Sequence, residues 1–257
     1  MTGLKAIYKK ELRSYFFSPV AYVAIGIFLF IMGMIFAKFV EIYHSYKIAN
    51  RYGAAQNITL DRLALFLYQN MAFILCFLTP LITMRLFAEE KRQHTFELLL
   101  TAPVKGFELV FGKFLAAFTL MGTMVALSFS YALFMIAWGN PDVRIILSNY
   151  LGLLLSVGCY VALGTFFSSL TSNQMIAAVI TFIALIFLWL LQTFAQGITV
   201  SFGPIEVGPT LVYISPLTHL NSFTEGVVQM KHLIYFVTFT GLLLFFTHRV
   251  VESNRWR

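Results

Sequence analysis

Six long apolar stretches constrain this chain more than any other feature of its sequence. They run over residues 20–40, 63–84, 110–138, 145–170, 175–194 and 233–247. The hydrocarbon core of a bilayer is about 30 Å thick and a helix rises about 1.5 Å per residue, so about 20 apolar residues can cross it. Only 11% of the residues are charged, whereas soluble domains carry about 25%. We therefore predict an all-α, polytopic membrane protein with six transmembrane helices in a single domain over residues 1–257.

Lysine and arginine are unevenly distributed between the two sets of connecting segments, and cytoplasmic loops normally carry the excess. A cytoplasmic N-terminus gives the cytoplasm the larger set, which is Lys5, Lys9, Lys10, Arg13, Arg85, Lys91, Arg92, Lys105, Lys113, Arg249, Arg255 and Arg257. The outer set is Lys47, Arg51, Arg62, Arg144 and Lys231, while Lys38 lies near the end of a span. We therefore predict that both termini are cytoplasmic. The net charge of +7 is attributed to this topology, not to nucleic-acid binding.

The segment 1–18 is amphipathic. Its apolar residues recur at helical spacing, while Lys5, Lys9 and Arg13 lie four residues apart on another face. This pattern predicts a helix that lies in the interface plane, with its basic face beside anionic lipid headgroups. The alternative is an ordinary basic flank ahead of the first span. In either case Pro19 ends the helix, because proline cannot continue it.

The segment 85–106 is the longest predicted cytoplasmic loop. Its first part is predicted to be a charged helix that includes Glu89 and Glu90, and Thr95 then caps a second, short helix with Glu97 near its positive end. The apolar residues of this helix are Phe96, Leu98, Leu99 and Leu100, and Pro103 ends it. We expect Phe96, Leu99 and Leu100 to project from this helix as an exposed contact surface. Such a helix can lie on the bilayer or insert into a soluble partner, and periodicity does not decide between them.

The outer segment 196–232 is too long for a simple connection and mixes glycine and proline with apolar runs. Irregular backbone at membrane depth survives only where protein or a wet cavity covers it. We predict short re-entrant helices that dip back from the outside, before the last span. The alternative is a surface loop with interfacial helices.

Several kinds of chemistry are excluded by the sequence. The segment 106–113 imitates a phosphate-binding loop, but five residues separate its glycines where four are needed, and Phe114 replaces the required Ser or Thr. ATP chemistry is therefore expected on another chain. The histidines are scattered, so we predict no metal site. Apart from Lys38 we expect no charged residue within the spans, which argues against a secondary transporter or proton pump.

Three segments together resemble the permease subunits of ATP-binding-cassette exporters of the type-2 class. The segment 87–104 is similar to the family's loop after the second span, with His94 where glycine is usual. The segment 164–177 resembles its tight turn between the fourth and fifth spans. The segment 214–227 resembles its outer segment, and its members include Ser215, Pro216, His219, Phe223 and Gly226. Within the class, the chain is most similar to the subunit associated with bacterial gliding motility.

This resemblance implies a mechanism and a set of partners. Two six-span permeases pair in the bacterial cytoplasmic (inner) membrane, and two separate ATPase subunits bind ATP and magnesium beneath them. The permease itself carries no catalytic residue and no cofactor. Its expected ATPase-coupling residues are Glu89, Glu90, Thr95, Phe96, Glu97, Leu98, Leu99, Leu100 and Pro103. The alternatives are ATP-driven transmission of force to a partner with an extracytoplasmic domain, and a channel or membrane scaffold.

Overall fold

The computed structural model describes residues 2–51, 60–93, 95–96, 105–139, 141–195, 201–202, 205–223, 226 and 228–253. Its helices are α1 (Thr2–Phe16), α2 (Pro19–Arg51), α3 (Leu60–Thr83), α4 (Arg85–Arg92), α6 (Gly106–Gly139), α7 (Val143–Leu170), α8 (Gln174–Ala195), α9 (Val207–Ile214), α10 (Pro216–Ser222) and α11 (Met230–Ser253). Two strands of two residues each, β1 (Ser201–Phe202) and β2 (Ile205–Glu206), pair antiparallel. The predicted all-α class is confirmed. The small β1–β2 hairpin was not predicted.

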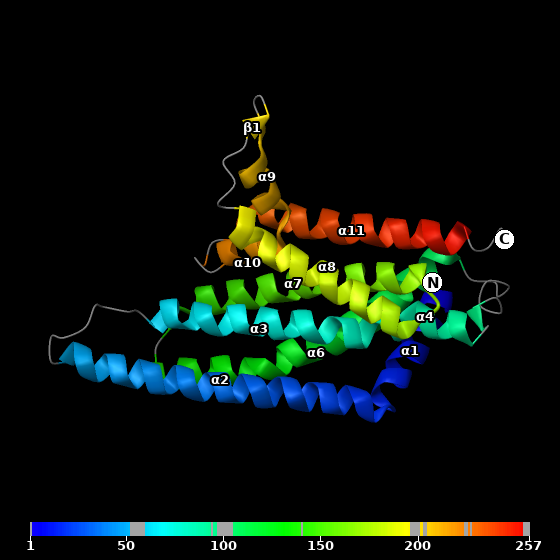
Figure 1. Cartoon of the computed structure of the whole chain (residues 1–257). Helices are drawn as coiled ribbons and strands as arrows, with labels where there is room; N and C mark the ends of the chain where they lie inside the picture. Colours follow the sequence, from blue (N-terminus) through cyan, green and yellow to red (C-terminus); the bar gives the residue numbers. More distant parts are fainter. Residues whose placement is uncertain are drawn as a thin grey trace.

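Within the described residues, six helices are long and apolar enough to cross a membrane, as the sequence predicts. They cover Pro19–Ile48, Ala64–Arg92, Gly106–Gly139, Val143–Leu170, Gln174–Ala195 and Met230–Ser253. The long helices run side by side, with α1, α4 and the C-terminal end of α11 at one end of the bundle (Figure 1). We call this the termini end. The opposite end, which carries α9 and α10, is called the α10 end.

The second span is longer than the sequence predicted. The charged helix predicted at the start of the segment 85–106 is present as α4, and only Met84 separates it from α3, so it continues the span. The cause is the apolar face of α4, because Leu86, Phe87 and Ala88 are all buried. The loop proper therefore starts after Arg92 rather than at Arg85.

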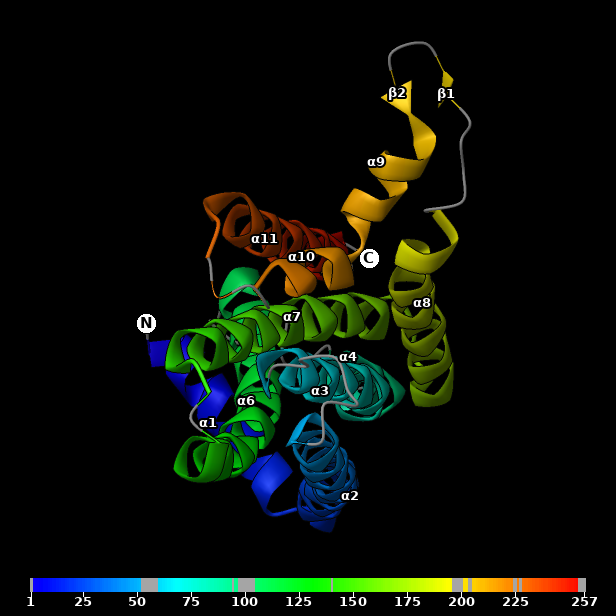
Figure 2. The ribbon, with the colours of Figure 1, turned by 90° about the vertical axis from the view of Figure 1, so that its left-hand side faces the viewer.

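Helix α7 lies at the centre of the bundle, with the other spans arranged around it (Figure 2). In its most apolar part 72% of the residues are buried, against 17% in α8 and 22% in α2 and α11. Close approach to α3 depends on Gly164, because a Cβ there would lie 2.1 Å from the Thr83 hydroxyl oxygen. Small residues at such crossings let membrane helices pack tightly.

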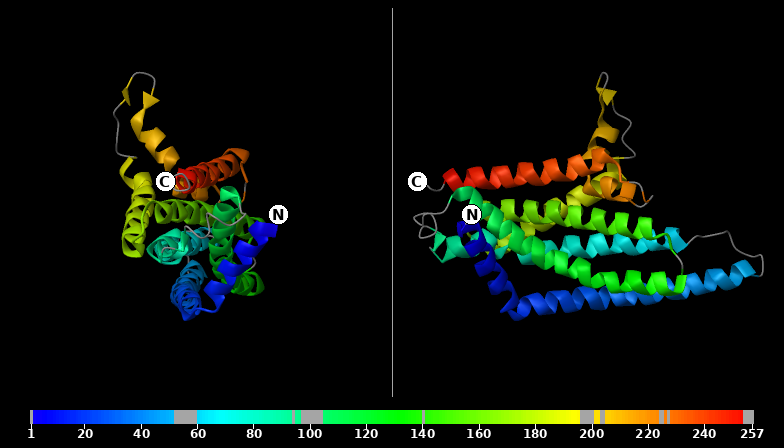
Figure 3. Two further views of the ribbon diagram at one scale, coloured as in Figure 1. Left: turned by 90° about the vertical axis from the view of Figure 1, so that its right-hand side faces the viewer. Right: turned by 180° about the vertical axis from the view of Figure 1, so that it is seen from behind.

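Helix α1 lies across the spans at the termini end (Figure 3). One of its faces is buried against the bundle through Ile7 and Tyr15, and the Tyr8 hydroxyl lies 3.1 Å from that of Thr119. The basic face predicted from Lys5, Lys9 and Arg13 is exposed. The helix and its exposed basic face are thus present, and its contact with lipid headgroups stays a prediction.

At the α10 end, α9 and the β1–β2 hairpin project away from the bundle, whereas α10 packs on it (Figure 2). Helix α10 contacts α7, α8 and α11. Its flanking residues Ser215 and Phe223 and its own His219 are buried. Protein therefore covers this short helix, as an irregular segment at membrane depth would require. Its depth in the bilayer stays a prediction.

Candidate functional site

A lysine is buried at the termini end, where three helices meet. Lys113 of α6 is 1% exposed, and its ammonium group lies 2.9 Å from a carboxylate oxygen of Glu11 and 2.8 Å from one of Glu90. It also donates a hydrogen bond of 2.7 Å to the carbonyl of Leu86. An ammonium group has three donors. All three are used, and these bonds offset the desolvation penalty of burying the charge.

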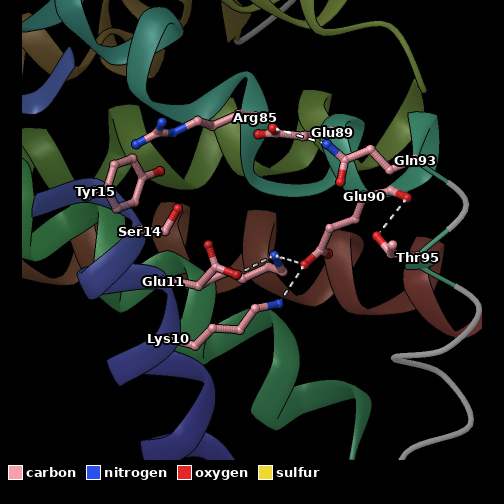
Figure 4. Close-up of a pocket in the computed structure, with 10 residues that line it drawn as sticks. Lys10, Glu11, Ser14, Tyr15, Arg85, Glu89, Glu90, Gln93 and Thr95 are labelled. Atoms are coloured by element: carbon pink, nitrogen blue, oxygen red, sulfur yellow. Dashed lines mark hydrogen bonds and ion pairs between the residues drawn. The ribbon is translucent and has the colours of Figure 1, made fainter. Parts of the chain in front are cut away.

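The cluster borders a cavity of about 420 Å³ between α1 and α4. Its lining is Lys10, Glu11, Ser14, Tyr15, Arg85, Glu89, Glu90, Gln93, Thr95 and Lys113. Figure 4 shows the side chains of Glu11 and Glu90 pointing towards each other from the two helices. Lys10 adds a longer ion pair of 3.6 Å to Glu90. The second carboxylate oxygen of Glu90 is buried, and within the described part of the chain nothing hydrogen-bonds to it.

A second contact joins α1 to α4 on the other side of the cavity. The Arg85 guanidinium lies 4.2 Å above the centre of the Tyr15 ring, a cation–π geometry. The Tyr15 hydroxyl donates a 2.9 Å hydrogen bond to the carbonyl of Ile82. Burial raises the pKa of Tyr15, so the phenol stays protonated and remains a donor.

Helix α4 is held on α7 by two serines that the sequence analysis missed. Ser168 accepts hydrogen bonds from the backbone N–H groups of Phe87 (3.1 Å) and Ala88 (3.3 Å) and donates one to the carbonyl of Met84 (3.0 Å). Lys91 donates to the carbonyl of Ser169. Both serines lie in the segment 164–177. The sequence pattern that could have identified them is a pair of serines at the end of an apolar span.

The predicted coupling residues divide into three groups. Glu89, Glu90 and Thr95 line the cavity, Phe96 packs against Phe87, and the others lie outside the described residues: Glu97, Leu98, Leu99, Leu100 and Pro103. Thr95 closes the preceding helix, because its backbone N–H (3.1 Å) and its hydroxyl (3.4 Å) both approach the carbonyl of Glu90.

Phe96 corrects the prediction for the second, short helix. It was expected on the free apolar face of that helix, and this is wrong for this residue. It is 5% exposed and packs edge-on against Phe87, with 6.3 Å between ring centres. Phe96 is therefore an anchor of the loop rather than part of a free surface.

The spans are not free of charge, contrary to our expectation. Lys113 lies inside the candidate span Gly106–Gly139, which also contains Glu108. The expectation was wrong because Lys113 was counted with the cytoplasmic flank, although the predicted span 110–138 and α6 both contain it. Its partners are residues of α1 and α4 at the termini end of the bundle.

Two histidines that the sequence presents as scattered meet at the α10 end. The Nδ1 atoms of His219 and His232 lie 2.7 Å apart, and His219 Nε2 lies 2.8 Å from the carbonyl of Tyr213. A carbonyl only accepts, so Nε2 of His219 carries the proton and its Nδ1 accepts from His232. His219 also stacks on Tyr235, with ring centres 3.7 Å apart. Burial lowers the pKa of His219, which keeps the imidazole neutral.

The remaining predicted outer residues fasten the same segment. The Ser215 hydroxyl donates a 2.8 Å hydrogen bond to the carbonyl of Leu188 in α8, and Pro216 begins α10. The carbonyl of Phe223 accepts a 2.8 Å hydrogen bond from Ser148 in α7. Gly226 has φ = 74°, which favours glycine. The structure thus brings these residues together as a packed attachment, and among described residues no group of three potential metal ligands occurs.

Six apolar helices, one of them central, with a crosswise α1 and an ion cluster at one end, define a multi-pass membrane protein. The family model described as "ABC-2 family transporter protein" matches residues 5–251, and the chain belongs to this family. Its class is therefore that of the membrane permeases of ABC transporters, as the resemblance indicated. Membership implies an ABC ATPase partner, and members are typically non-catalytic membrane subunits. A comparison with curated proteins finds no match.

Proposed function

We propose that this chain is the permease subunit of an ATP-binding-cassette exporter. A separate ATPase subunit, which binds ATP and magnesium, docks at the termini end, and a second six-span permease completes the pathway. The observation that carries the proposal is the attachment of α4. It is bonded to α7 through Ser168 and to α6 through Lys113, and the loop predicted to contact the ATPase follows it directly. A push on that loop would therefore reach several spans as a rigid-body displacement.

The distribution of charge supports a cytoplasmic termini end. The basic helix α1 and the charged helix α4 lie together at one end of the bundle (Figure 1). Arg144 begins the central span, and Lys231 the last span, at the other end. Cytoplasmic segments carry the excess of basic residues. With the termini end in the cytoplasm, the proposed ATPase contact would lie on the side where ATP is present.

A second candidate function is transmission of force to a partner with an extracytoplasmic domain, without movement of a solute. The observation that favours it is the projecting pair of α9 and the β1–β2 hairpin at the α10 end (Figure 2). A projecting element of this kind offers a contact for such a partner. Co-purification of that partner with no transported species would favour this function over export.

The test is purification from native membranes, followed by ATPase assays. The chain should retain an ABC ATPase, and it should hydrolyse no ATP when stripped of that subunit. Leu99→Asp should reach the membrane at a normal level but lose the ATPase, because an unpaired charge in a buried contact costs several kcal/mol. Glu97→Ala is the milder companion, since a charge near a helix start contributes about 0.3–1 kcal/mol. ATP turnover by the isolated chain, or full retention of the ATPase by Leu99→Asp, would contradict the proposal.

A further inference from the structure

Helix α1 packs closely on α6 but faces α4 across the cavity. On the α6 side, Ile7 lies 3.0 Å from the position of a Cβ on Gly112, and Tyr8 meets Thr119. On the α4 side, the cavity of about 420 Å³ separates the two helices. The side chains that bridge this cavity are charged or aromatic: Glu11 and Tyr15 from α1, and Arg85 and Glu90 from α4. The joint between α1 and α4 is therefore largely electrostatic.

Lys113 is the centre of this joint. Its ammonium group bonds to Glu11 of α1 and Glu90 of α4, and to the backbone of α4 at Leu86. Removing the ammonium would leave the two carboxylates facing each other, and the 3.6 Å ion pair from the largely exposed Lys10 to Glu90 is the one that would remain to them among the described residues. Lys113 thus determines whether Glu11 of α1 and Glu90 of α4 share a cation or repel each other.

Helix α1 is tightly linked to the first span. Phe17 and Ser18 join it to α2, and their backbone N–H groups donate to the carbonyls of Arg13 (2.8 Å) and Tyr15 (3.1 Å). A link of two residues with both N–H groups bonded leaves little freedom. Helix α2 is also peripheral, with 22% of its most apolar part buried. A shift of α1 can therefore move α2 without disturbing the core around α7.

We propose that Lys113 is a positioning residue that fastens α1 to α4, so that displacement of α4 is passed through α1 to the first span. The inference rests on the proposed function for the source of that displacement. The joint itself is a property of the chain alone. Its purpose is to make the crosswise helix, the start of the coupling loop and the adjoining end of α6 move together.

The test measures the distance between α1 and α4 in the isolated chain in lipid nanodiscs. Spin labels on Ala6→Cys and Arg92→Cys, both at exposed positions, report this distance by pulsed electron resonance. Four proteins are compared: the native chain, Lys113→Arg, Lys113→Met, and a neutral triple variant that adds Glu11→Gln and Glu90→Gln to Lys113→Met. A label pair at Arg144→Cys and Lys231→Cys, at the α10 end, is the control. The native cysteines Cys76 and Cys159 are buried.

The native chain should give one narrow distance, which Lys113→Met should lose together with thermal stability. The neutral triple should recover stability, because no unpaired carboxylate remains, but not the narrow distance. Lys113→Arg should retain both. If the triple restores the narrow distance as well, Lys113 is merely a structural residue and the inference is wrong. A triple no more stable than Lys113→Met would also overturn it, because the buried charges would then not form the joint.

A second measurement uses the complex with its co-purified ATPase. Trapping the ATPase with vanadate and ATP should change the environment of labels on α1 in the native complex, and not in the neutral triple. Because the nanodisc measurement needs no ATPase, its failure would refute the joint alone, whereas failure to retain any ATPase would refute the proposed function alone.

Discussion

Polar side chains are buried in this molecule where they can form hydrogen bonds. The hydroxyls of Thr79, Ser156 and Thr181 are fully or almost fully buried, and each donates to the carbonyl four residues earlier, at 2.7, 2.9 and 2.7 Å. This local bond satisfies the hydroxyl within its own helix. Lys113 and His219 cannot bond in this way, so their partners come from other elements. Such residues hold helices together, and their loss should be felt far from their own positions.

The pH dependence of stability should report His219. Burial lowers its pKa from the ordinary value of 6.5, so the unfolded state binds the proton more readily. Stability from this residue is therefore present above pH 6.5 and declines as the pH falls below it. We expect the midpoint temperature of unfolding in detergent to decrease as the pH is lowered from about 8 to about 5.5, the range in which histidines titrate. His219→Gln should flatten this decline. Parallel curves for the variant and the native chain would show that another group is responsible.

At the scale of elements, the helices are positioned by close approaches and by a few cross-links. Helix α7 meets α3 at Gly164 and meets α10 at Gly152, where a Cβ would lie 3.0 Å from Leu220 and from Phe223. Hydrogen bonds from Ser148 and Ser168 then fix α7 to the α10 segment and to α4. The central span thus connects the two ends of the molecule. A displacement at one end has a direct mechanical route to the other.

Gly164→Ala should separate α3 from α7. The added Cβ would meet three atoms of Thr83, at 2.1, 2.7 and 2.9 Å, so the backbones themselves must move apart. Overpacking of this kind typically costs about 1–3 kcal/mol. Gly241→Ala in α11 is the matched control, because nothing lies within 4 Å of its Cβ position. Thermal unfolding should show a clear loss for the first variant and none for the second. Equal midpoints would mean that the α3–α7 contact is looser than described.

At the scale of the whole molecule, the two ends differ in character. The termini end gathers charges from α1, α4 and α6 around a cavity, whereas the α10 end gathers aromatic rings and histidines around α10. The peripheral spans α2, α8 and α11 present apolar surfaces outwards. The termini end is thus charged, the spans are apolar, and α10 packs on the spans at the opposite end. Such a molecule is suited to a membrane with different partners on its two sides.

Labelling of cysteines in intact cells should reveal the orientation. Lys231→Cys should react with a thiol reagent that cannot cross the membrane, because basic residues are fewer on its side. Arg13→Cys should react only after the membrane is permeabilised. Both side chains are exposed, so access rather than burial controls the result. The reverse pattern would invert the topology and remove the proposed ATPase contact from the cytoplasm.

The sequence by itself determined the fold class and the number of spans. Apolar length translates directly into a helix that crosses the bilayer, since lipid leaves the backbone no other way to satisfy its polar groups. The spacing of apolar and basic residues likewise predicted α1 and its exposed face. The order of short segments, 87–104, 164–177 and 214–227, indicated the family. All of these are properties of neighbouring residues.

The tertiary structure alone decided which distant residues meet. Lys113 and Glu11 are far apart in the sequence, as are Ser168 and Phe87, and no periodicity relates them. The same is true of His219 and His232, which the loop after α10 separates. Phe96 was misplaced because an apolar residue after a charged helix is equally compatible with a free surface and with a partner such as Phe87. Burial depends on what the rest of the chain brings alongside, and that information lies in the packing of helices, not in any one of them.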